Sequence, residues 1–158
     1  CGSNLDLWVS RLKGFNRPEF YLMDRGARPP EKPKYHAIAA EFCKRGNCTV
    51  WATDRKELEN YIHPKVIKSK YPAYAGTGDA FEDVPMLFAQ AVHEASNTGG
   101  SWAEVISDLE KLEKKVSSAK RRLNSEFVQM MTADLLTDID ANNEVRAWLK
   151  AIGLALTG

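Results

Sequence analysis

The sequence has no long run of hydrophobic residues, and its charges nearly cancel. Its 158 residues include 22 Lys and Arg and 21 Asp and Glu, a formal net charge of +1. No segment approaches the roughly 18 to 20 apolar residues that a membrane-spanning helix needs, and the first residues do not form a basic and apolar secretion signal. These absences predict a cytoplasmic protein without membrane partners. A nearly neutral surface has no broad field for nucleic acid, so any DNA contact must be local.

Cysteine is also scarce, with three residues in the chain. An odd number does not build a disulfide framework. Cys43 and Cys48 flank "CKRGNC", but no second Cys or His pair lies nearby, which favours reduced thiols over a zinc site. Cys1 opens the chain without a methionine, inside what reads as a loop, "CGSNLDLW". We therefore expect the chain to be a piece of a longer protein.

The first part of the chain has the pattern of a parallel α/β unit. Two short apolar, aromatic and β-branched runs, "EFYLMD" and "CTVWAT", flank a segment with apolar residues at helical spacing. A strand, a helix and a second strand in this order form a parallel βαβ unit. We expect a short amphipathic helix ending at Gly14, a strand over 19–24 with Asp24 at its C-terminal end, a helix over 35–46 closed by Gly46, and a strand over 48–53.

The second part has the pattern of helices. Residues 68–84 are rich in turn formers and predict a long loop. Ser101 and Glu104 form a capping-box pattern ahead of apolar residues that continue at helical spacing to Val116. We expect two further helices, over about 118–136 and 144–152. The predicted architecture is α/β, with a partial parallel sheet in residues 1–98 followed by a helical region in residues 99–158.

Three carboxylates are predicted at one edge of the sheet. Asp24 and Asp54 follow the two strands, and Glu59 comes shortly after. Ligands gather outside the carboxyl ends of parallel strands, and carboxylate oxygens suit Mg²⁺. If Lys56 and Glu59 share one helical turn, a cation would lie beside them, as phosphoryl transfer requires. The alternative is that "DRKELENYIHP" (54–64) is a solvated, charged helix start, since acids favour helix N-termini for dipole reasons alone.

A family resemblance bears on these alternatives. The order "YLMDR", helix, "TVWAT" and "DRKELENYIHP" resembles the Toprim domain of the OLD family of ATP-linked endonucleases. In that family an aspartate motif closes one strand, and a "K-R-E-x-E-N-Y-L" segment follows the next. The later "AKRRLN" and the closing Glu-x-x-x-Trp-Leu helix also look like that family's C-terminal helical region. The resemblance covers residues 15–65 and, more loosely, 118–152.

Carried over by position, the resemblance implies roles for several residues. Asp24 and Glu59 would be metal ligands for Mg²⁺ or Mn²⁺, and Lys120 would be the transition-state lysine, with Lys56 and Arg55 as nearer alternatives. Two features depart from the family pattern. The Asp-x-Asp motif reads Asp24, Arg25, Gly26 here, with Glu31 or Asp54 as possible substitutes, and the family's N-terminal glutamate would precede Cys1. We therefore expect weak metal binding and little activity from the chain alone.

The resemblance implies a metal-dependent DNA nuclease module in anti-phage defence. Its parent would include an ATPase module and form a homo-oligomer. DNA would contact Arg55, Lys56 and Lys120. The alternatives are a non-catalytic Toprim-like module for assembly or DNA docking, which Gly26 favours, and an interaction domain unrelated to nucleic acid.

Other polar and aromatic residues have plainer interpretations. His36 and His93 fall in helical patterns and are predicted to be structural. Pro64 after His63 predicts the end of a helix. Core packing rather than base stacking is predicted for three tryptophans that fall at the buried positions of their apolar patterns, Trp51, Trp102 and Trp148. The basic cluster at 111–123 favours a solvated helix face over a DNA contact.

Overall fold

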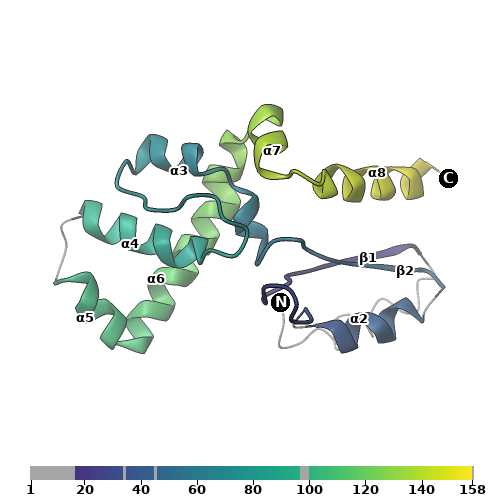
Figure 1. Ribbon diagram of the computed structural model, residues 1–158, viewed down its shortest axis with the longest axis horizontal. Helices are drawn as coiled ribbons and strands as arrows, with labels where there is room; N and C mark the ends of the chain where they lie inside the picture. The colour runs from purple at the N-terminus through teal and green to yellow at the C-terminus, as the bar shows by residue number, and fades with distance from the viewer. Residues whose placement is uncertain (1–16, 34, 45, 97–99, 158) are drawn as a thin grey trace.

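The computed structural model describes residues 17–33, 35–44, 46–96 and 100–157. Strand β1 (Glu19–Met23) pairs in parallel with β2 (Cys48–Ala52), with Glu19 opposite Cys48 and Met23 opposite Ala52. Helix α2 (His36–Cys43) connects them and packs against the sheet, as Figure 1 shows. The prediction of a mixed α/β fold that begins with a parallel βαβ unit is confirmed. The helix expected before Gly14 lies outside the described residues.

The two faces of this sheet differ in their covering. On one face, Met23 and Phe42 are buried and form a small core with partly buried neighbours that include Tyr21 and Val50. On the other face, Phe20 stacks on Trp51 with ring centroids 5.5 Å apart. Among the described residues, α2 therefore covers the face of the sheet that carries Met23.

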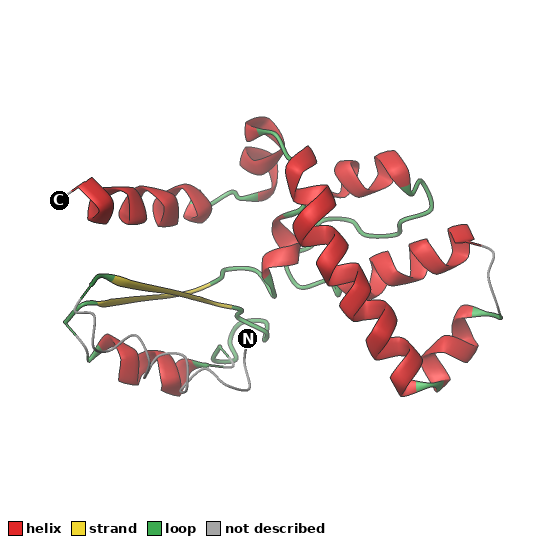
Figure 2. Ribbon diagram, turned by 180° about the vertical axis from the view of Figure 1, so that it is seen from behind, coloured by secondary structure: helices red, strands yellow, loops and turns green. Residues whose placement is uncertain are grey.

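The remainder of the described chain consists of helices and the loops that join them. Helices α4 and α6 pack along each other, and α8 extends away from them (Figures 1 and 2). None of the helices in the described ranges is long and apolar enough to cross a membrane. The elements are η3 (Leu58–Tyr61), α3 (Pro64–Lys70), α4 (Val84–Ser96), α5 (Trp102–Ser107), α6 (Leu109–Arg122), a π-helical turn η4 (Leu123–Phe127), η5 (Val128–Met130), α7 (Ala133–Ile139) and α8 (Glu144–Thr157).

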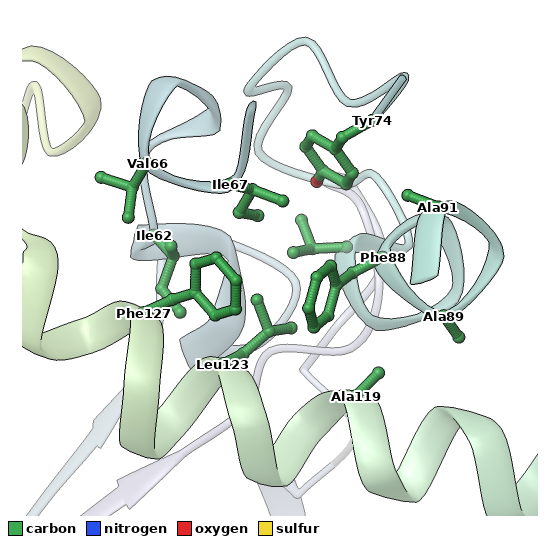
Figure 3. Close-up of a cluster of buried hydrophobic side chains, with 11 residues drawn as sticks. Ile62, Val66, Ile67, Tyr74, Phe88, Ala89, Ala91, Ala119, Leu123 and Phe127 are labelled. Carbon is green, nitrogen blue, oxygen red and sulfur yellow. The ribbon is translucent and has the colours of Figure 1, made fainter. Parts of the chain in front are cut away.

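The larger core joins segments from both parts of the sequence (Figure 3). Phe88 of α4 and Phe127 of η4 are fully buried and meet edge to face, with ring centroids 4.9 Å apart. Tyr71 packs edge to face against Phe88. Ile67 of α3 and Leu123 of η4 are fully buried in the same cluster. The segment after β2 and the later helices therefore share one core, which fixes α6 relative to the sheet edge.

The helix predicted after the capping box is interrupted. The capping box of Ser101 and Glu104 is confirmed, but α5 ends at Ser107. Asp108 has an extended backbone, with φ −109° and ψ 98°, and its side chain accepts a hydrogen bond from the Lys111 N–H. It therefore caps a second helix, α6, in the way that aspartate caps helix N-termini.

The helix predicted over 118–136 is wrong in its bounds. Residues 118–122 belong to α6, which continues into the π-helical turn and the 3₁₀ turn. Met131 is extended, and Thr132 caps α7 by accepting a hydrogen bond from the Leu135 N–H. The last helix begins at Glu144 as predicted but runs on to Thr157. Periodic apolar residues show which face is buried, but they did not reveal these breaks.

Other predicted bounds shift by a few residues. Helix α2 ends at Cys43, with Lys44 rather than Gly46 as its C-cap. The predicted loop over 68–84 is shorter, because α3 extends to Lys70 and α4 starts at Val84. Pro64 begins α3 instead of ending a helix, at a position where its missing N–H costs nothing.

Three residues given structural roles can be placed. His93 is buried, and its Nε2 lies 3.2 Å from the Gly100 carbonyl oxygen. His36 is exposed, so no burial supports a structural role for it. Trp148 is buried and packs edge to face against Tyr61, as its core phase predicted.

Candidate functional site

The ends of the two strands are tied together at their C-terminal edge. Asp24 follows β1, and its Oδ1 accepts a hydrogen bond from the Leu58 N–H at 3.1 Å. The Gly26 N–H donates to the Lys56 carbonyl oxygen at 2.9 Å. The turn after β1 therefore lies against the segment after β2, where the sequence predicted a convergence of polar groups.

Glu57 is a carboxylate at this edge that forms an ion pair with the helical region. It has an extended backbone as the N-cap residue of η3, and its side chain is 13% exposed. Its Oε2 forms an ion pair with the Nζ of Lys120, near the end of α6. Lys120 therefore lies beside the sheet edge, where the resemblance would put a transition-state lysine.

The ammonium group of Lys120 lies within electrostatic reach of three carboxylates. Partial burial works to lower the pKa of Lys120, but the hydrogen bond to Glu57 and the charges of Glu57, Glu59 and Asp24 outweigh it, so the pKa is raised. Lys120 is therefore a cation in this site at neutral pH. The same charges make the site attractive to an added cation.

Glu59 is buried, not solvated. Only 5% of the residue is exposed, and its Oε1 accepts a hydrogen bond from Asn124 Nδ2 at 2.9 Å. Asn124 lies on the π-helical turn directly after α6, four positions after Lys120. The interpretation of this stretch as an exposed helix start does not apply to Glu59.

Lys56 reaches the site in a different way from that expected. The 3₁₀ turn begins at Leu58, so Lys56 and Glu59 do not share a helical turn. The Nζ of Lys56 lies 2.8 Å from Asp83 Oδ2 and 3.9 Å from Glu57 Oε1. Lys56 and Lys120 therefore both approach the carboxylate of Glu57.

Arg55 is bound into the fold. Its guanidinium donates to the carbonyl oxygens of Asn60 and Gly78, both at 3.1 Å, and to that of Ile139 at 2.7 Å. Burial lowers the pKa of Arg55, although nearby carboxylates, Asp140 first among them, oppose this. The guanidinium N–H groups of Arg55 are therefore used inside the protein. In this conformation Arg55 has a structural role, where the sequence predicted a contact with DNA.

Asp54 has its partners at the start of α8 and in the segment just before it. Its Oδ2 accepts a hydrogen bond from Asn142 Nδ2 at 2.8 Å, and its N–H donates to both carboxylate oxygens of Glu144 at 3.0 and 3.1 Å. Asp54, Asn142 and Glu144 line a cavity of about 200 Å³ together with Arg55 and Asp140. The structure therefore brings Asp24 and Glu59 around Lys120 but directs Asp54 toward the start of α8.

Glu144 is itself perturbed by this arrangement. Burial raises the pKa of Glu144 to about 7, and the negative charge of Asp54 adds to that, against the hydrogen bond from the Asp54 N–H and the charge of Arg55. This carboxyl group is therefore partly protonated at neutral pH. It docks the start of α8 against the end of β2.

Sequence reasoning missed Glu57 and Asn124. Glu57 lies in the same "DRKELENYIHP" stretch. A helical turn starting at Lys56 would pair Lys56 with Glu59, but the turn starts at Leu58, and Glu57 is its N-cap residue. Asn124 lies four positions after Lys120, a spacing that puts two side chains on one helical face, and this signal was present in the sequence.

The donor chemistry of the site fits a divalent cation. Carboxylate oxygens are the ligands that Mg²⁺ and Mn²⁺ prefer, and Asp24, Glu57 and Glu59 supply them around one lysine. Within the described ranges, no group of three or more His, Cys, Asp and Glu is already arranged to hold a metal ion. These carboxylates would therefore have to reorient to hold an ion together.

Comparison with protein-family models, with curated proteins and with solved structures produced no match to this chain. The geometry of the site and the pattern of the sequence therefore carry the functional argument.

Proposed function

We propose that the chain is the metal-dependent DNA nuclease module of an OLD-type, ATP-linked endonuclease, with a Toprim-like fold. It hydrolyses phosphodiester bonds with Mg²⁺ or Mn²⁺. Its parent combines this module with an ATPase module, forms a homo-oligomer and acts in the cytoplasm in anti-phage defence. The observation that carries the proposal is the ion pair between Lys120 and Glu57, beside Asp24 and Glu59 at the carboxyl ends of both strands.

Each residue of the site has a distinct role in this reaction. Asp24, Glu57 and Glu59 hold the divalent cation, which when bound supplies positive charge beside the scissile phosphate. Lys120 neutralises the charge that builds on the phosphate oxygens in the transition state. Lys56, which contacts Glu57 and Asp83, adds a second positive charge for the DNA backbone.

A second candidate is a non-catalytic Toprim-like module that serves assembly or DNA docking. Gly26 stands where the family pattern has its second aspartate, and its φ is +73°, a left-handed conformation that favours glycine. Its N–H ties the turn to Lys56. This position therefore connects the two strand ends in place of a carboxylate, which favours the docking function.

Substitution of Lys120 in the intact parent separates the two functions. With Lys120→Ala, cleavage of plasmid DNA in the presence of Mg²⁺ or Mn²⁺ should fall about 100-fold or more, because a donor at the transition state is lost. The matched control is Lys114→Ala on the same helix, whose lysine is 74% exposed and pairs with Glu110. Cleavage by the control should be unchanged.

DNA affinity measured across a salt series completes this test. If Lys120 stabilises the transition state, its loss should lower the cleavage rate more than the DNA affinity. If Lys120 only binds the DNA backbone, its loss should lower both equally. DNA binding without any cleavage by the wild-type parent would establish the docking function instead. Equal cleavage by wild-type and Lys120→Ala proteins would refute the role of Lys120.

A further inference from the structure

The last two turns of α8 are apolar on every side. Residues 151–156 read "AIGLAL", without a polar side chain among them, and we call this segment the α8 tip. A helix that is hydrophobic all round is normally buried. Leu154 and Leu156 are nevertheless 65% and 81% exposed, and the α8 tip lies beyond the helices of the larger core (Figure 1). The single copy therefore leaves a large apolar surface in contact with water.

An apolar groove lies at the base of the same helix. It has a volume of about 500 Å³, and Val145 and Trp148 of α8 line one side of it. Leu58 of η3 and Val128 of η5 line it from other sides, although they are 42% and 47% exposed. No charged side chain is among the described residues that line the groove. Apolar surfaces of this kind mark sites where another molecule binds.

The α8 tip cannot fill the groove of its own copy. Both belong to one continuous helix, in which Val145 and Leu156 are separated by about 16 Å along the axis. The base of this helix is fixed, because the carboxylate of Asp140 accepts hydrogen bonds from the backbone N–H groups of Glu144 and Val145, at 3.1 and 3.0 Å. An α8 tip that enters this groove must come from another molecule.

The apolar residues of α8 are spaced for pairing with a second α8. They form a stripe with intervals of four, three and four residues, the spacing of a coiled-coil seam, at Val145, Leu149, Ile152 and Leu156. Leu149 is 64% exposed. In an antiparallel pair of these helices, Val145 of one copy lies opposite Leu156 of the other copy. Each α8 tip then reaches the groove of the other copy.

We propose that a second copy of this chain covers the groove, with the two α8 helices antiparallel and each α8 tip in the groove of the other copy. The interface is isologous, so each contact between tip and groove occurs twice. The two surfaces are complementary in charge because neither has any, so no charged group loses its water when they meet. Arg146 and Lys150 of α8 fall outside the apolar stripe.

The size of the two surfaces suits a stable dimer. Twelve residues line the groove, and six form the α8 tip. With Leu149, these come close to the roughly 20 to 30 residues that each partner contributes to a standard interface. Exposed leucines at the tip and an uncharged groove of this volume are therefore enough for a specific contact between two copies.

The test is the oligomeric state of the full 158-residue chain. Sedimentation velocity between about 1 μM and 1 mM should show a species with twice the 17.7 kDa mass of the single chain. Leu156→Glu in the α8 tip and Val128→Glu in the groove should each weaken association about 100-fold, because symmetry removes each apolar contact twice. Thermal melting shows that each variant is folded.

The matched control is Leu109→Glu. Leu109 lies at the start of α6, is 74% exposed and does not line the groove. This variant gains the same charge on an equally exposed leucine, so it should associate as the wild-type chain does. A loss of association in the control equal to that of Leu156→Glu would mean that added charge alone separates the copies, and it would refute the proposed contact.

A mixture of two variants tests the exchange of α8 tips. Leu156→Glu keeps its groove and Val128→Glu keeps its tip, so the mixed pair retains one complete contact, whereas each variant alone retains none. The mixture should associate more tightly than either variant. In the wild-type chain, isotope-filtered NMR of labelled and unlabelled copies should show contacts between the methyl groups of Leu156 and those of Leu58 or Val128.

Three outcomes would overturn the inference. They are a chain that stays monomeric at about 1 mM, a dimer that Leu156→Glu and Val128→Glu both leave intact, and a dimer without NMR contacts between tip and groove. In the first case the groove is left to a different protein or to a small apolar molecule. The inference does not rest on the proposed nuclease reaction, and none of the substitutions changes a residue of that site, so its failure leaves the nuclease proposal to its own test.

Discussion

Lys120 and Glu57 are 63 positions apart in the sequence and form an ion pair at the edge of the sheet. The pair joins the end of α6 to the segment that follows β2. It puts a cation among Glu57, Glu59 and Asp24. In the proposed metal site, the charge of Lys120 would therefore compete with a divalent cation for the same carboxylates.

The first prediction concerns this competition. Lys120→Met keeps the length of the side chain and removes its charge, so Mn²⁺ affinity of the chain should rise several-fold, because a positive neighbour is lost from the carboxylates. Calorimetric titration measures this change. Lys114→Met on the exposed side of α6 is the control and should leave Mn²⁺ affinity as it is. A drop in affinity with Lys120→Met would mean that the lysine supports the ion rather than opposing it.

The second prediction concerns Glu59. Glu59→Gln keeps the shape of the side chain and its acceptor for Asn124 but removes the charge, so Mn²⁺ affinity should fall about 10-fold or more, and the melting temperature should change by only a few degrees. Both quantities are measured on the same preparations. Full cleavage by the intact parent carrying Glu59→Gln would exclude Glu59 as a ligand.

The third prediction separates a structural Arg55 from a DNA-binding one. Arg55→Lys keeps the charge but replaces two separate donor nitrogens, Nη1 and Nη2, with one ammonium nitrogen that cannot reach all three carbonyl oxygens, so the free energy of unfolding in urea should fall by about 2 kcal/mol. DNA affinity per folded molecule should change little. A variant that is fully stable but has a DNA-binding salt slope smaller by about 0.9 would instead show that Arg55 contacts a phosphate.

The fourth prediction concerns pH. The pKa of Glu144 is raised from 4.5 to about 7 in the folded chain, so the folded state binds more protons than the unfolded state between these values. The stability that this group contributes is complete below about pH 4.5 and is lost as the pH rises through 7. Since Glu144 is only partly buried, solvent screening limits the change to about 1 kcal/mol.

Glu144→Gln provides the comparison for the pH prediction. It removes the titration but keeps an acceptor for the Asp54 N–H, so its melting temperature should depend less on pH between 5 and 7.5 than that of the wild-type chain. Other groups that titrate in this range contribute equally to both proteins. Parallel melting curves across this range would show that Glu144 has an ordinary pKa.

Local features of the sequence were sufficient to predict the βαβ unit. The apolar and β-branched runs formed β1 and β2, and Asp24 follows β1 directly, because strand ends are marked by the residues beside them. The capping box at Ser101 was read correctly for the same reason, since both its hydrogen bonds lie within one turn. Short-range hydrogen bonds and periodic burial can be recognised without knowledge of the rest of the chain.

The direction of each polar side chain was decided by tertiary structure. Asp54 and Asp24 both follow strands, but Asp54 meets Asn142 and Glu144, because the start of α8 docks against the end of β2. Glu57 meets Lys120 because the core around Leu123 and Phe127 holds α6 beside the sheet edge. Composition and spacing determined which charged residues were available and which strands they follow. Which of them face one another depends on contacts between segments tens of residues apart, and only the packed chain brings those segments together.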